Sequence, residues 1–236
     1  MSTMRDTMSS CSIETQWAGE FLDKWIPAAF QDLASIAHPT PYAANRTMFS
    51  EKEPPYGVYL VLEGEVKLSM NSIDGRRLIL RIAKKGEILG LASALSGNPY
   101  EVTAETLYPC KLAFLSRRDF LGILVRHPEV YQTLTEELTR NISAACEQLR
   151  TVGLSASVPE KLARLLLDWS ENGQTTEGGT RLRFSLTHGE IGEFIGASRE
   201  TVTRTLTLFK TRRLVDFNGS MMTIPSKAAL ENYARC

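Results

Sequence analysis

The spacing of hydrophobic and polar positions changes twice along the chain. Between about Thr47 and Leu115 the apolar residues form short β-type runs, VYLVLEG, EVKLSM, RLILRIA and CKLAFL, separated by turn signals such as Asp74-Gly75. Glycines recur through this region at intervals of roughly ten residues, a spacing typical of strand corners. The pattern predicts an antiparallel β-barrel or sandwich.

On both sides of this region the apolar residues follow helical spacing. Residues 13 to 38 carry large apolar side chains at intervals of three and four, interrupted by Pro27, which predicts two short helices. From Pro128 to Thr151 one helix is predicted. Its narrow apolar stripe consists of Leu134, Leu138, Ile142, Ala145, Leu149 and Val152. Such a stripe is typical of a two-stranded coiled coil, and a helix lying on its own barrel is the alternative.

The C-terminal third of the sequence contains the start and stop signals of short helices. Ser157 precedes a helix over KLARLLLDWS, and residues 171 to 180 (ENGQTTEGGT) are expected to form a loop within a domain. Thr187 and Glu190 match a capping box, which predicts a helix start. Gly196 then supplies the left-handed residue that ends this helix.

A second helix is expected to begin at Ser198, with Val202, Leu206 and Phe209 on its inner face. The opposite face then presents Arg199, Glu200, Thr203 and Arg204. Two helices joined by a glycine turn, the second with a polar face, indicate a helix-turn-helix.

The polar face of the second helix suits the major groove of DNA. Arginine can donate two hydrogen bonds to guanine, and glutamate can accept one from cytosine N4. A carboxylate would be repelled by phosphates, so Glu200 favours the reading of bases. An Arg-Glu pair alone is more often a solvated helix face. The caps, the turn and the predicted hairpin around Asn218-Gly219-Ser220, which with a strand at 182–184 would form a wing, favour DNA recognition.

Composition and charge narrow the choice of function. The chain has 236 residues, 43% of them hydrophobic, which is enough for two domains. The net charge is zero, but residues 181 to 213 hold seven basic and three acidic side chains, a local excess of +4. No apolar run is long enough to span a bilayer and no secretory signal is evident, so a cytoplasmic protein without membrane contact is expected.

The chemistry-bearing residues indicate neither a metal site nor an enzyme. The cysteines Cys11, Cys110, Cys146 and Cys236 are far apart, and the three histidines are scattered. The sequence has no P-loop, no H-E-x-x-H motif and no recognisable nucleophile with its base. We therefore expect reduced thiols, no bound metal and no catalytic residues.

The segment LTHGEIGEFIGASRETVTRTL resembles the recognition segment of the CRP/FNR family of bacterial transcription regulators, related to the cyclic-AMP receptor protein. The resemblance covers nearly the whole chain. It implies an α+β fold with a cyclic-nucleotide-binding-type, jelly-roll-like antiparallel β-barrel at residues 13–127, a dimerisation helix at 128–152 and a winged helix-turn-helix at 153–236.

The resemblance also implies partners and a DNA site. Arg199, Glu200 and Arg204 would read a TGTGA-like half-site, and Ser198, Thr203 and Thr187 complete the expected DNA-binding set. A two-fold homodimer would place both recognition helices on one palindrome of double-stranded DNA. RNA polymerase is a further expected partner, with the segment 171–180 as a candidate contact.

The expected effector pocket departs from the pattern of cyclic-AMP binders. Gly86 to Gly90 keep the G-x-x-x-G corner that precedes the nucleotide-binding residues of the family. Leu91 stands where the cyclic-AMP binders have a glutamate for the ribose. Tyr100 and Glu101 stand near the place of an Arg-Ser pair for the phosphate, and a carboxylate there would repel a phosphate. We therefore expect no tight binding of cyclic AMP. The candidate pocket residues are Gly90, Leu91, Ser93, Tyr100, Glu101 and Cys146.

The redox branch of the family matches no better. Its [4Fe-4S] cluster needs four cysteine ligands, and only Cys110 resembles one of them, so no cluster is expected.

The leading hypothesis is a regulator controlled by an effector other than cyclic AMP, or one that binds DNA constitutively. The alternatives are redox or nitric-oxide sensing through Cys146 or Cys110, although buried packing is expected for Cys146, and a ligand-binding protein with a vestigial DNA-binding domain.

Overall fold

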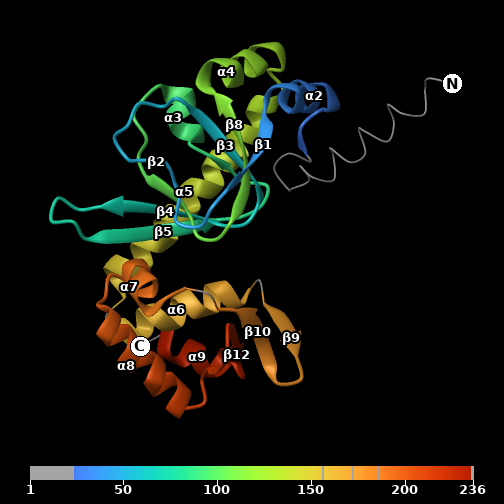
Figure 1. Ribbon diagram of the computed structural model, residues 1–236. Helices are drawn as coiled ribbons and strands as arrows, with labels where there is room; N and C mark the ends of the chain where they lie inside the picture. The colour runs from blue at the N-terminus through green and yellow to red at the C-terminus, as the bar shows by residue number, and fades with distance from the viewer. Residues whose placement is uncertain (1–23, 156, 172, 185, 235–236) are drawn as a thin grey trace. The chain divides into compact units, whose positions relative to one another are not determined.

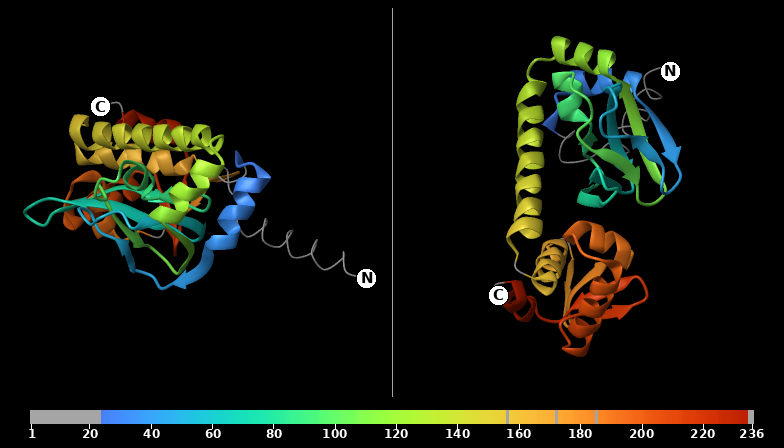
Figure 2. Two further views of the ribbon diagram at one scale, coloured as in Figure 1. Left: turned by 90° about the horizontal axis from the view of Figure 1, so that it is seen from above. Right: turned by 90° about the vertical axis from the view of Figure 1, so that its left-hand side faces the viewer.

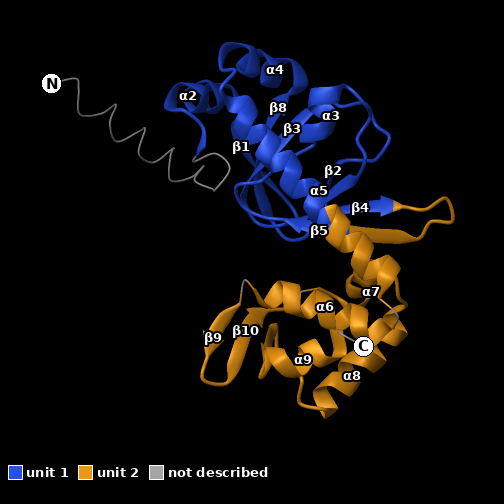
Figure 3. Ribbon diagram, turned by 180° about the vertical axis from the view of Figure 1, so that it is seen from behind, with its two compact units in different colours: residues 1–70, 80–144 blue, residues 71–79, 145–236 orange. Residues whose placement is uncertain are grey.

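The computed structural model describes residues 24–155, 157–171, 173–184 and 186–234. The chain forms two compact units, shown in different colours in Figure 3. The first contains the residues up to Met70 together with Leu80–Ala144, and the second contains Asn71–Ile79 and the chain from Ala145 onward. The apolar residues of the N-terminal helix expected before residue 24 lie outside the described ranges.

Two four-stranded antiparallel sheets form most of the N-terminal part (Figure 1). The first has the order β1 (His38–Tyr42), β8 (Cys110–Ser116), β3 (Gly57–Glu63), β6 (Ile88–Leu89). The second has the order β2 (Thr47–Phe49), β7 (Thr103–Thr106), β4 (Val66–Asn71), β5 (Arg77–Ala83). The four β-type runs of the sequence are β3, β4, β5 and β8, which confirms them as strands. The described residues form no strand pair between the sheets, so the jelly-roll-like barrel is not closed.

Three helices accompany these sheets. They are α2 (Pro27–Ile36), α3 (Leu91–Ser96) and α4 (Arg117–Arg126). Pro27 begins α2 rather than interrupting a helix. Amide groups in the first turn of a helix have no partner within the helix, so a proline there loses no hydrogen bond. Leu33 of α2 and Phe120 of α4 are buried in one core with Leu60 and Leu115 of the first sheet.

The long helix α5 (Val130–Leu154) is continuous in all views (Figure 2). Its apolar residues do not form a single stripe. Leu134 is only 1% exposed and packs in the core of the N-terminal unit, whereas Ile142 and Leu149 are 66% and 67% exposed. Leu134 of the expected seam therefore packs in the core of the N-terminal unit, Ile142 and Leu149 face solvent, and Ala145 and Val152 are half-buried. Cys146 is exposed on α5, so the expectation of a buried thiol was wrong.

The C-terminal unit combines short helices with a third sheet. The helices are α6 (Val158–Ser170), α7 (His188–Ile195), α8 (Arg199–Thr211) and α9 (Lys227–Ala234). The sheet has the order β11 (Asp216–Asn218), β12 (Met221–Ile224), β10 (Gly179–Arg183), β9 (Gln174–Thr176). The hairpin of β11 and β12 and its pairing with β10 confirm the predicted wing. The segment 171–180 contains β9 and the start of β10, so it is a hairpin rather than the expected loop.

The fold is thus α+β, with a cyclic-nucleotide-binding-type sheet domain, a long helix and a winged helix-turn-helix. Among the residues that the structure describes, no helix is long and apolar enough to cross a membrane.

Candidate nucleic-acid interface

The first helix of the helix-turn-helix begins at a complete capping box. The Thr187 hydroxyl accepts a hydrogen bond from the Glu190 amide at 3.2 Å, and the Glu190 carboxylate accepts one from the Thr187 amide at 2.9 Å. Both bonds satisfy amide groups that the first turn of a helix leaves without partners. The predicted start of α7 at Thr187 is therefore confirmed, and Thr187 itself lies exposed at the positive end of the helix.

Two glycines shape the turn between α7 and α8. Gly196 ends α7 in the left-handed conformation, with φ 64° and ψ 42°, as expected. Gly192 lies inside α7, where an added Cβ would stand 2.4 Å from the carbonyl oxygen of Ala197. The turn therefore needs a residue without a side chain at both positions. The sequence analysis overlooked Gly192, although a glycine inside a helical pattern can signal close backbone packing.

The second helix, α8, separates an anchoring face from a polar one. Ser198 caps it by accepting from the Thr201 amide, while Val202, Leu206 and Phe209 are buried. Arg199, Glu200, Thr203 and Arg204 are all exposed in the first two turns, as predicted. No carboxylate of the described residues lies within salt-bridge distance of the guanidinium of Arg199 or of Arg204. These donors are available to a ligand.

Glu200 remains ionised at the start of α8. Hydrogen bonds from its own backbone amide and from the Ser198 side chain, together with the charges of Arg199 and Arg204, hold the pKa of Glu200 below its ordinary value of 4.5. An ionised carboxylate accepts hydrogen bonds and does not donate them. Glu200 therefore complements a donor such as an exocyclic amino group.

One contact on this face was missed by the sequence analysis. His188, the first residue of α7, places its Nδ1 atom 2.8 Å from the Thr203 hydroxyl oxygen. That hydroxyl also donates to the Arg199 carbonyl at 2.9 Å. His188 and Thr203 are fifteen positions apart in the sequence, so no local pattern predicts the contact. Only the turn brings the two helices together.

The C-terminal end of α7 is held by a buried amide. The Gln148 side chain of α5 donates to the Phe194 carbonyl at 2.6 Å and to the Ile79 carbonyl of β5 at 2.9 Å, all within the second unit. The last carbonyls of a helix lack partners within the helix. Gln148, which was not among the predicted site residues, supplies the partner for one of these carbonyls and so connects α5 to the end of α7.

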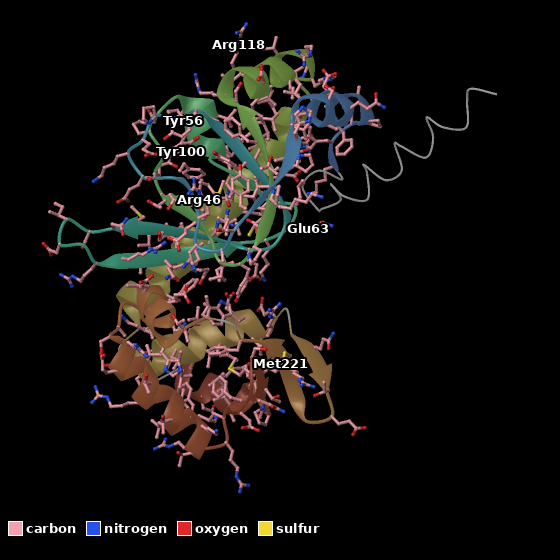
Figure 4. The ribbon with its side chains drawn as sticks, in the orientation of Figure 1. Arg46, Tyr56, Glu63, Tyr100, Arg118 and Met221 are labelled. Carbon is pink, nitrogen blue, oxygen red and sulfur yellow. The ribbon has the colours of Figure 1, made fainter. Side chains whose placement is uncertain are left out.

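The expected effector corner of the N-terminal unit is filled by an aromatic side chain. Tyr100 is 2% exposed, and its ring stacks on Phe49 with centroids 4.0 Å apart. Its hydroxyl accepts from the Gly57 amide at 3.1 Å and donates to the Gly57 carbonyl at 2.7 Å. Figure 4 shows Tyr56 beside it, in an edge-on contact with centroids 5.6 Å apart. Burial raises the pKa of Tyr100, so its hydroxyl remains neutral.

The other candidate pocket residues do not assemble an anion site. Gly90 lies under the Tyr100 ring, where an added Cβ would come within 2.8 Å of the ring. Leu91 is buried in the core, and the Ser93 hydroxyl donates to the Pro99 carbonyl. Glu101 is exposed. Cys146 belongs to the other unit.

The remaining groups offer little for a metal or a reactive thiol. Burial raises the pKa of the Cys110 thiol, which disfavours the reactive thiolate. Within the described ranges, no group of three or more histidine, cysteine or acidic side chains could hold a metal ion.

Comparison with known protein families agrees with both parts of the chain. The model of the cyclic nucleotide-binding domain matches residues 39–127, and that of the Crp-like helix-turn-helix domain matches residues 160–233. The chain belongs to the CRP/FNR family of transcription regulators. The helix-turn-helix of α7 and α8 is therefore the DNA-binding element of a CRP/FNR-family protein.

Relatives and solved structures show how far the likeness to the CRP/FNR family extends. The transcriptional activatory protein AadR of Rhodopseudomonas palustris is 30% identical over 190 residues, covering 80% of this chain and 78% of that protein. The CRP-like cAMP-activated global transcriptional regulator of Mycobacterium tuberculosis is 28% identical over 210 residues, covering 89% and 93%. The structure of FixK2 from Bradyrhizobium japonicum has the same fold, with a TM-score of 0.74, 22% identity and coverage of 84% and 97%. These relatives are regulators and not enzymes.

Proposed function

We propose that this protein is a homodimeric regulator that reads a palindromic, TGTGA-like DNA site without cyclic AMP. The observation that carries the proposal is the exposed polar face of α8, on which Arg199 and Arg204 have no carboxylate partner among the described residues and lie beside the ionised Glu200. The Arg204 guanidinium donates to the Thr201 hydroxyl at 3.3 Å within the same helix. Arg199 and Arg204 would donate to guanine edges, and Glu200 would accept from cytosine N4.

The residues around α8 would set the register on the duplex. Thr187 and Ser198 cap the N-termini of α7 and α8, where the helix dipoles favour phosphate. Thr203 lies between the base-reading side chains. RNA polymerase remains an expected partner of the DNA-bound form.

The exposed face of α5 supports the dimer. Six exposed residues follow the alternating spacing of four and three that defines a coiled-coil seam: Thr135, Thr139, Ile142, Cys146, Leu149 and Gly153. The hydroxyls of Thr135 and Thr139 donate to carbonyls one turn earlier, at 2.8 Å each. Their methyl groups therefore remain available for packing. The same face of a second α5 helix has the same spacing and would cover this face in a dimer.

The filled corner at Tyr100 supports independence from cyclic AMP. A buried, neutral phenol whose hydroxyl bonds both polar groups of Gly57 offers no cation to a cyclic phosphate. The Mycobacterium tuberculosis relative is a cAMP-activated regulator. The departure at Tyr100 and Glu101 leads us to propose either another effector or constitutive DNA binding for this chain.

Selection of binding sites from random duplexes, followed by a mobility-shift titration, tests DNA reading. We expect Arg199→Ala to weaken binding to the selected site by about 1–3 kcal/mol, because one arginine-guanine contact is lost. Arg118→Ala removes an exposed arginine on α4 and serves as the matched control, with no expected change. Equal affinities of wild type and Arg199→Ala on every sequence would contradict the proposal and favour a vestigial DNA-binding domain.

Two further measurements test the dimer and the effector. Ile142→Glu should produce a monomer in sedimentation, whereas Ser143→Glu, on an exposed neighbouring position, should leave the dimer intact. Calorimetric titration of the wild type with cyclic AMP should show no binding. Submicromolar affinity would overturn that part of the proposal.

An exposed thiol gives a second candidate for control. Cys146 is exposed in the single chain and would lie in the α5 seam of the proposed dimer, whereas Cys110 is buried. If Cys146 senses an oxidant or nitric oxide, Cys146→Ser should abolish any change in DNA affinity that such reagents cause.

A further inference from the structure

Thr203 lies at the centre of the polar face of α8. At about 100° per residue, it projects about 40° around the helix from Arg199 and about 60° from Glu200. It is exposed, as are both of those neighbours. A side chain at this position would meet the base edges between the groups contacted by Arg199 and Glu200.

The hydroxyl of Thr203 is already engaged on two sides. Its single proton is donated to the Arg199 carbonyl at 2.9 Å. His188 Nδ1, at 2.8 Å, must therefore act as the donor to the same oxygen. This fixes the proton of the neutral imidazole on Nδ1. The hydroxyl therefore has no proton left to donate to a base, and one of its two lone pairs is already used.

The methyl group is the part of the exposed Thr203 side chain that takes no part in these contacts. In the major groove, the base-edge group that an exposed methyl can contact is the C5 methyl of thymine. We propose that Thr203 reads one thymine of each half-site through its methyl group, with His188 as the positioning residue that holds the rotamer. This inference rests on the proposed DNA-binding function.

Other threonines of α8 provide matched controls. Thr207 is exposed one turn later and its hydroxyl donates to the Thr203 carbonyl, but no histidine contacts it. Thr203→Ser keeps the hydroxyl and removes the methyl. Thr203→Val keeps a methyl and removes the hydroxyl. These two variants separate an apolar contact from a hydrogen bond.

The test uses the full chain and the duplex that wild type selects. Each thymine of one half-site is replaced in turn by deoxyuridine, which lacks the C5 methyl. At one position we expect about four-fold weaker binding by wild type, the equivalent of one buried methyl group. Thr203→Ser should show no such loss there, whereas Thr207→Ser should retain it in full. Thr203→Val keeps a methyl but loses the bond to His188, so it should retain the loss in part. His188→Ala should reduce it, because the rotamer is released.

The outcomes separate this inference from the function on which it rests. If wild type selects no sequence, the proposed function fails. If wild type selects a site on which Arg199→Ala binds weakly, but Thr203→Ser and wild type respond alike to deoxyuridine at every thymine, the DNA-reading function holds and the methyl contact is wrong.

Discussion

The helix α8 and the corner around Tyr100 differ in whether their polar groups are exposed or already hydrogen-bonded within the protein. On α8 the guanidinium groups of Arg199 and Arg204 are exposed, and no described carboxylate pairs with them. In the corner, the Tyr100 hydroxyl bonds both backbone groups of Gly57, and its ring is stacked on Phe49. The comparison teaches that a site recognises a partner with groups that the fold leaves exposed and with bonding capacity to spare. The first region is prepared for a partner, and the second has become part of the core.

The largest expected effect concerns the filled corner. Tyr100→Ala should lower the free energy of unfolding of the N-terminal unit by about 3–5 kcal/mol, because it leaves a cavity over Phe49. Tyr100→Phe keeps the ring but leaves two buried groups of Gly57 without a partner, and should cost about 1–3 kcal/mol. Denaturant unfolding followed by tyrosine and tryptophan signals measures both. A neutral Tyr100→Ala would show that the corner is not a packed core.

The next effect concerns the turn that presents α8. Gly192→Ala would force a methyl group against the Ala197 carbonyl, and we expect about 1–3 kcal/mol of destabilisation and weaker DNA binding. Gly189→Ala is the control in the same helix, where the nearest atom to an added Cβ is 3.8 Å away. It should be neutral or stabilising by up to about 1 kcal/mol. Thermal unfolding compares the two, and equal effects would contradict the close approach at Gly192.

A smaller effect is expected at the cap of α8. Ser198→Ala removes the acceptor for the Thr201 amide and should cost about 1 kcal/mol of stability. Ser198→Asp restores an acceptor and should recover the loss. Urea unfolding of the two variants checks the pair, and an Asp variant no more stable than the Ala variant would rule out capping as the cause.

The smallest effect is an expected absence of pH dependence. The pKa of Glu200 is lowered from its ordinary value of 4.5, so the stabilising contacts of its carboxylate are present above that value and are lost only as pH falls through the lower folded value. Base preference opposite Glu200 should therefore be the same at neutral pH and at mildly acidic pH. Binding-site selection at two pH values measures this. A preference that disappears on mild acidification would mean that the contact is made by a group that takes up a proton between the two pH values, and not by Glu200.

Sequence reasoning succeeded where a feature is local. The capping box at Thr187, the left-handed Gly196 and the cap at Ser198 each depend on residues within one turn, and all three are present. Four of the eight strands of the two N-terminal sheets, β3, β4, β5 and β8, were likewise visible as short β-type runs. Local signals therefore predicted much of the fold and the exposed positions of the proposed DNA-reading residues on α8.

Features that join distant segments were not predicted. The contact of His188 with Thr203 and the bridge of Gln148 to Phe194 both need the folded turn. The split of the α5 stripe could not be read from spacing, because Leu134 and Ile142 are equally apolar and differ only in what covers them. The family resemblance placed Tyr100 and Glu101 near the expected Arg-Ser pair, but the stacking of Tyr100 on Phe49 depends on a strand about fifty residues earlier.

The two hydrogen bonds between Tyr100 and Gly57 limit how this protein can evolve. An arginine at position 100 would have to satisfy the carbonyl and the amide of Gly57, yet a guanidinium can only donate, so the amide would lose its partner. The ring of Phe49 would also lose its stacking contact with the ring of Tyr100. An arginine for a cyclic phosphate at position 100 would therefore require further substitutions around Gly57 and Phe49.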